Sequence, residues 1–104
     1  MNDKINEIAS LIMYKGITIN CILQDARLNG DNYEINNSDN NTIVTIKSYA
    51  PYNLNIIDTY IYDNEENLIK QILYINGKEK TVFDKYQGVL DLINNINASK
   101  NIAS

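Results

Sequence analysis

The chain has 104 residues, a formal net charge of −4, one cysteine, and neither histidine nor tryptophan. The absence of histidine excludes Ser–His and Cys–His catalytic pairs and histidine-based zinc sites, and a lone cysteine cannot form an internal disulfide. A chain of this length predicts one domain, residues 1–104, with a core large enough to fold without a structural metal.

An amphipathic helix is predicted at the N-terminus. Asn2 or Asp3 is a suitable N-cap, and Gly16 is a suitable stop after Lys15. The apolar stripe of this helix is formed by Ile5, Ile8, Ala9 and Ile12. Charged residues interrupt the segment, unlike a signal peptide, and no apolar run in the chain is long enough to cross a bilayer. We therefore expect a cytoplasmic protein of a bacterial host that does not bind membranes.

Apolar residues alternate from Ile17 onward, which predicts a strand over residues 17–28 with a bulge near Gln24-Asp25, where the parity of the pattern changes. In such a strand, Cys21 is a small buried core residue whose thiol is not activated. Asn29-Gly30 then predicts a two-residue hairpin turn into a strand that contains Tyr33 and Ile35.

Four further strands are predicted in the middle of the chain. Their ranges are 42–49, 54–62, 68–75 and 78–82. The polar stretch 36–41 and the break at Ala50-Pro51 separate the first of them from its neighbours, and Asn76-Gly77 predicts a tight hairpin between the last two. Apolar residues occur at both odd and even positions of residues 54–62, and so on both faces of the predicted strand. This pattern is typical of a central strand with both faces partly covered.

A second amphipathic helix is predicted at the C-terminus. The capping pattern Thr81-Val82-Phe83-Asp84 precedes it, apolar residues at helical spacing continue to about Asn97, and residues 98–104 are expected to be a frayed tail. The order of elements predicts an α+β fold: a single antiparallel sheet of five or six strands with an N-terminal and a C-terminal helix packed on it.

No motif predicts a catalytic, metal or cofactor site. The acidic residues near position 63 lack the alternating ligands and glycine turn of a calcium loop, and the Tyr-x-x-x-Lys spacing of Tyr74 and Lys78 spans a hairpin without a dinucleotide-binding loop before it. Residues 1–66 contain ten acidic and four basic residues, so most of the negative charge lies in this part of the chain.

Tyrosine is the least ordinary feature of the composition, with eight tyrosines against one phenylalanine. Tyrosine combines a large apolar ring with a hydroxyl that tolerates water, and it is enriched at protein interfaces. Tyrosines and acidic residues cluster in one span of the sequence, where the segment 49–52 is expected to form a protruding rim. The predicted partner-binding residues are Tyr49, Tyr52, Asp58, Tyr60, Tyr62, Asp63, Glu65 and Glu66.

Three classes of function fit these features. The first is a small acidic module that inhibits a host enzyme by docking on its basic, nucleic-acid-binding surface. In size, charge and composition the chain is similar to phage anti-CRISPR inhibitors, and its abundance of Asn and Ile is typical of AT-rich coding. This class predicts a protein partner, no direct contact with nucleic acid, and no catalysis. It is compatible with a homodimer.

The second class is a phage virion or assembly subunit, or an immunity-type protein, which would equally lack catalytic residues. The third is an enzyme that uses carboxylates and tyrosines alone, which requires a pocket and a carboxylate with a strongly raised pKa. Self-association into large assemblies would favour the second class, and such a pocket would favour the third. The sequence favours the first.

Overall fold

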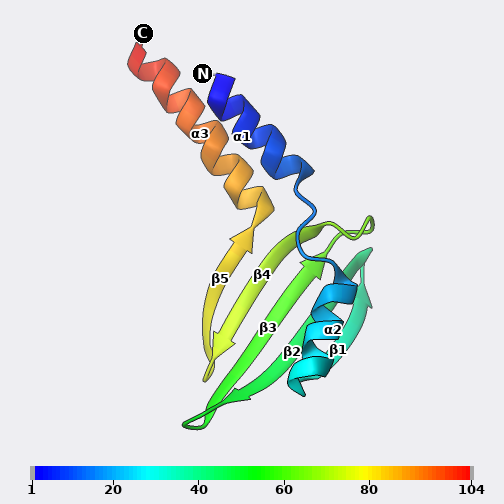
Figure 1. Ribbon diagram of the computed structural model, residues 1–104. Coiled ribbons are helices and arrows are strands. Elements are labelled where there is room, and N and C mark those ends of the chain that lie inside the picture. The colour runs from blue at the N-terminus through cyan, green and yellow to red at the C-terminus, as the bar shows by residue number, and fades with distance from the viewer. Residues whose placement is uncertain (1, 104) are drawn as a thin grey trace.

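The computed structural model describes residues 2–103 and has an α+β fold, as predicted (Figure 1). Its elements are α1 (Asn2–Met13), α2 (Ile19–Asn29), β1 (Asn32–Ser38), β2 (Asn41–Ala50), β3 (Leu54–Tyr62), β4 (Leu68–Ile75), β5 (Lys78–Asp84) and α3 (Lys85–Ala103). The five strands form one antiparallel sheet in which each strand pairs with its neighbour in the chain.

Tight turns set the register of the outer hairpins. The turn between β4 and β5 is Asn76-Gly77, and both residues have positive φ, which confirms the predicted hairpin. The turn between β1 and β2, Asp39-Asn40, has positive φ at both residues as well. β3 is the central strand of the sheet, as its apolar pattern on both parities predicts.

The segment predicted as the first strand, residues 17–28, is instead helix α2. Thr18 caps its N-terminus by accepting a hydrogen bond from the Cys21 amide, and Gly30 ends it in the left-handed conformation. The predicted Asn29-Gly30 hairpin is therefore wrong, because Gly30 serves as a helix C-cap. The strand prediction failed because the apolar residues of this segment also fit helical spacing, as Ile19, Ile22, Leu23 and Ala26.

The core lies between α2 and one face of the sheet. Ile22 and Ala26 of α2 are buried there against residues of β2, β3 and β4, namely Val44, Ile46, Tyr62 and Leu68. Figure 1 shows α2 crossing this face in front of β1 and β2. Cys21 lies on the outer side of α2 and is exposed, which corrects its predicted burial.

α1 and α3 pack on each other beyond the end of the sheet. Figure 1 shows them antiparallel, with both chain ends at the far end of the pair. Lys85 is buried at their base, where its Nζ donates hydrogen bonds to the carbonyl oxygens of Ile12, at 3.2 Å, and Tyr14, at 2.7 Å. The helix that covers the core is thus α2, while α1 and α3 form a projecting helix pair.

The start and the end of α3 differ from the prediction. Its N-cap is Asp84, whose Oδ1 accepts a hydrogen bond from the Gln87 amide, while Thr81 remains in β5. The helix continues to Ala103, so residues 98–103 of the expected frayed tail are helical, and Ser104 lies outside the described residues.

Candidate functional site

The predicted partner-binding residues follow β2 and β3 and divide into three groups. Tyr49 and Tyr52 lie at the β2–β3 hairpin, Asp58 and Tyr60 lie in the middle of β3, and the others lie at or beyond its opposite end. β3 has nine residues, and a strand rises about 3.3 Å per residue, so the two ends are separated by roughly 25 Å. These residues therefore do not form a single surface.

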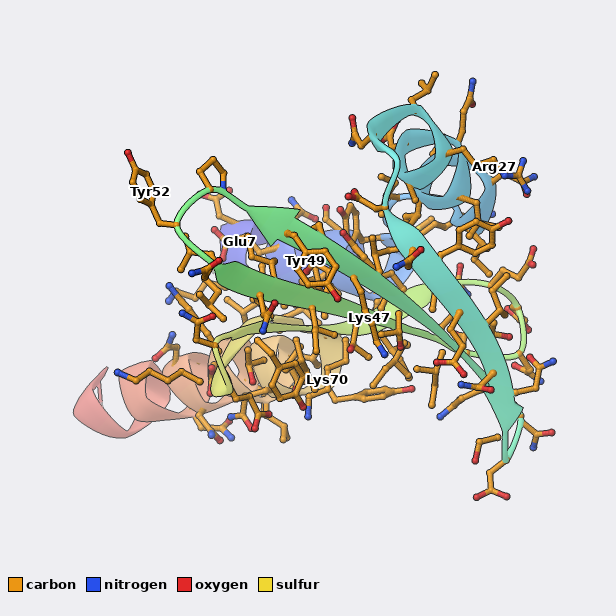
Figure 2. The ribbon with its side chains drawn as sticks, turned by 90° about the horizontal axis from the view of Figure 1, so that it is seen from below. Glu7, Arg27, Lys47, Tyr49, Tyr52 and Lys70 are labelled. Carbon is orange, nitrogen blue, oxygen red and sulfur yellow. The ribbon has the colours of Figure 1, made fainter. Side chains whose placement is uncertain are left out.

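The β2–β3 hairpin forms the protruding rim that the sequence predicts. Ala50 pairs with Leu54, leaving a three-residue loop, and the loop residues Tyr52 and Asn53 have φ of 67° and 60°. Tyr52 is 96% exposed and Tyr49 is 75% exposed. Figure 2 shows the Tyr52 side chain projecting into open space from the tip of the hairpin.

A cavity of about 170 Å³ lies between the C-terminal half of α2 and the sheet. Three carboxylates line it, from Asp25 on α2, Asp31 after α2 and Asp58 on β3, together with Tyr60. Ser48 also lines it, and the hairpin loop begins three residues further along β2, about 10 Å away at the rise of a strand. The hairpin therefore lies near the acidic cavity along β2, but Tyr49 follows Ser48 in the strand and so lies on the opposite face of the sheet.

The lining of this cavity contains three carboxylates and no basic side chain. Asp58 is held in place by the Gln71 side chain, whose Nε2 donates to Asp58 Oδ1 at 3.1 Å. Burial, then the charge of Asp58 and a hydrogen bond to it, raise the pKa of Tyr60. Arg27 does not line the cavity, because its guanidinium lies 5.7 Å from the centre of the Tyr33 ring.

An ammonium or guanidinium group is the natural complement of such a cavity. Carboxylates accept charge-assisted hydrogen bonds from lysine and arginine, and these bonds are about twice as strong as neutral ones. Within residues 2–103, no group of three or more cysteine, aspartate and glutamate side chains is placed to hold a metal ion.

Tyr62 is a core residue. Its prediction as a partner-binding residue is therefore wrong. Its side chain is fully buried in the core, and its hydroxyl donates a hydrogen bond to the carbonyl oxygen of Ile17. Burial, followed by the charges of Tyr60 and other neighbours, raises the pKa of Tyr62 to about 12. A residue without exposed surface cannot contact a partner in the folded state.

Asp63 shapes the turn between β3 and β4. Its Oδ1 accepts hydrogen bonds from the amides of Glu65 and Asn67, both at 2.9 Å. Desolvation raises the pKa of Asp63, but these hydrogen bonds and that of the Asn67 side chain outweigh it, so the pKa lies below its usual value. Glu65 and Glu66 are exposed on this turn, at the other end of β3 from the hairpin.

Sequence reasoning missed Asp25 and Asp31 as site residues. It placed Asp25 at a strand bulge, whereas the helical spacing of the neighbouring apolar residues would have placed it on a helix beside Ala26. The fold then brings α2 against β3, and this contact between distant segments could not be derived from local pattern.

Comparison of the chain with protein-family models, with curated proteins and with solved structures found no match. Among the helices within residues 2–103, none is both long and apolar enough to span a membrane.

Proposed function

We propose that this protein is a protein-binding module without catalytic activity, which docks on a basic surface of its partner. We name as the recognition surface the hairpin residues 49–53 together with Asp25, Asp31, Asp58 and Tyr60. The observation that carries the proposal is the hairpin, because it holds two strongly exposed tyrosines close to an acidic cavity, with Tyr49 on the sheet face opposite to that cavity.

Both parts of the recognition surface suit a protein partner. Exposed tyrosines are frequent among the residues that dominate binding energy, and an acidic surface accelerates association with a basic one. Tyr52 supports this assignment, because a tyrosine at positive φ costs about 1–2 kcal/mol of backbone strain. A nearly fully exposed ring gains little from folding that would offset this cost, so a role in contact explains it better.

The partner class that fits is a nucleic-acid-handling enzyme, whose substrate groove presents lysine and arginine. An acidic module that occupies such a groove excludes nucleic acid, which is how a phage-type inhibitor of a host defence enzyme, similar to anti-CRISPR proteins, would act. The alternative is a phage virion or assembly subunit. The exposed apolar residues of α1 and α3 favour that alternative, since assembly requires self-association.

Capture from host lysate with matched variants tests the proposal. The tagged chain, its Asp25→Asn/Asp58→Asn variant and a Glu79→Gln control are compared by quantitative mass spectrometry at low and moderate salt. Loss of two carboxylates from the cavity should reduce recovery of the partner about tenfold or more, as removal of charge-assisted contacts does.

Glu79 is exposed on β5 and does not line the cavity, so its variant should recover the partner like the unaltered chain. Recovery of a nucleic-acid-handling enzyme that depends on the cavity carboxylates and decreases with salt supports the proposal. Equal recovery of every protein by all three chains rejects the recognition surface, and recovery of particle components alone supports the assembly alternative.

A further inference from the structure

α1 and α3 each carry apolar side chains on two adjoining faces, and only one of these faces is covered by the other helix. The covered faces meet at Leu11, which packs against Gly88; a β-carbon at Gly88 would lie 2.8 Å from Leu11 Cδ2. The uncovered faces form what we call the helix-pair stripe. Its members are between 40% and 61% exposed and are Ile5, Ile12, Tyr86, Leu90 and Ile93.

The two halves of the helix-pair stripe lie on one side of the pair. Ile12 of α1 and the α3 residues Tyr86 and Leu90 line a single groove of about 570 Å³, with Ile69 of β4 also in its lining. A second hollow beside it is lined by Tyr86, Leu90, Ile69 and Ile61. Both linings also contain charged side chains, Asp63 and Lys85 in the groove and Lys70 and Asp84 in the second hollow. The surface that extends from the helix pair to the strands at its base is therefore largely, but not wholly, apolar.

The solvent-accessible surface area of the chain is larger than that of a typical compact monomer of the same mass. It is 7543 Å², whereas a monomeric protein of 11.9 kDa exposes about 6,000 Å². The excess, about 1,500 Å², is larger than the roughly 800 Å² that each partner buries in a standard protein interface. The radius of gyration, 17.0 Å, likewise exceeds the value of about 13 Å for a compact chain of this length.

We infer that a second copy of this chain covers the helix-pair stripe, so that two helix pairs form a four-helix bundle. A two-fold axis requires a surface that complements itself, and an uncharged stripe along two antiparallel helices meets this condition. The helix pair is also electrically neutral, with three acidic and three basic residues, whereas residues 14–84 carry the whole net charge of −4. A second copy thus meets no net repulsion at the stripe.

A different protein of basic character is a poorer occupant, because its charge would draw it to the acidic middle of the chain instead of the neutral pair. The inference does not rest on the proposed function. Figure 1 shows the helix pair and the β2–β3 hairpin at opposite ends of the molecule, so the two surfaces can be altered independently.

Sedimentation equilibrium of the full chain tests the inference. The unaltered chain should have twice the chain mass of 11.9 kDa. Ile12→Glu and Leu90→Glu should each raise the dimer dissociation constant about tenfold or more, because each places a charge within the apolar interface. The matched control is Leu28→Glu, since Leu28 is 77% exposed on α2, away from the stripe, and its variant should remain dimeric.

Far-UV circular dichroism verifies that each variant is folded. If a glutamate variant unfolds, Leu90→Gln introduces no charge and should still shift the equilibrium toward the monomer. A monomeric unaltered chain overturns the inference, as does a dimer that both stripe variants leave intact. An assembly larger than a dimer also overturns it, since a closed two-fold bundle leaves no stripe free.

Discussion

The hydroxyl of Tyr62, at the end of the central strand β3, connects the sheet to the segment between α1 and α2, through its hydrogen bond to the Ile17 carbonyl. Tyr62→Phe keeps the buried ring and removes this bond. We expect it to lower the free energy of unfolding by about 1–2 kcal/mol, because the Ile17 carbonyl loses its partner. Urea unfolding measures the change, and Tyr49→Phe, at an exposed ring, should leave stability unaltered.

The same residue predicts an alkaline dependence of stability. The pKa of Tyr62 is raised from 10.0 to about 12 in the folded state, so folding favours the neutral hydroxyl. Its contribution is complete below pH 10 and is lost as the pH rises toward 12. The unaltered chain should therefore lose stability more steeply in this window than Tyr62→Phe, and equal slopes would contradict the assignment.

Tyr52 predicts the opposite effect on stability. Asparagine adopts positive φ more readily than tyrosine, so Tyr52→Asn should raise the free energy of unfolding by about 1 kcal/mol. The same variant should weaken partner capture, because it removes an exposed ring from the recognition surface. A variant that is no more stable than the unaltered chain would show that the backbone strain is absent.

At the scale of elements, Gly16 determines how the chain passes from α1 into α2. It has φ of +75°, and a β-carbon there would lie 2.6 Å from the β-carbon of buried Leu68. Gly16→Ala should therefore destabilise the fold by about 2–4 kcal/mol, through strain and displacement of the core. Thermal unfolding measures this loss.

Gly77→Ala is the matched control for Gly16→Ala. Gly77 has φ of +82°, but nothing lies within 4 Å of a β-carbon placed there. The free energy of unfolding of Gly77→Ala should fall by only about 1 kcal/mol, the cost of holding alanine at positive φ. Equal losses at the two glycines would mean that the contact with Leu68 contributes nothing.

The sequence predicts the strands from residue 42 onward well, because positive-φ turn residues such as Asn76-Gly77 separate alternating apolar runs. It fails at α2, because a short apolar segment fits both periods until tertiary contact selects one. The candidate site also has one part that local sequence pattern predicts and one part that depends on tertiary contact. The hairpin tyrosines are predicted from local pattern, whereas the acidic cavity depends on α2 lying against β3, which is a contact between distant segments.

For the whole molecule, charge and apolar surface are separated in space. The acidic cavity and the tyrosine hairpin lie on the sheet portion, while the neutral, apolar helix pair projects from the other end (Figure 1). A dimer through the helix pair would leave both recognition surfaces free. Such a dimer would present two equivalent sites, and its avidity would depend on whether a partner offers two basic patches at matching separation.

The measurement that tests the recognition surface most directly is a titration of the ¹⁵N-labelled chain with a hexalysine peptide, followed by amide chemical shifts. The account predicts salt-sensitive shifts concentrated around Asp25, Asp31, Asp58 and the hairpin, which the Asp25→Asn/Asp58→Asn variant abolishes. Shifts of equal size at Glu65, Glu66 and Glu79, or shifts that the variant retains, would contradict it, because the peptide would then be responding to net charge alone.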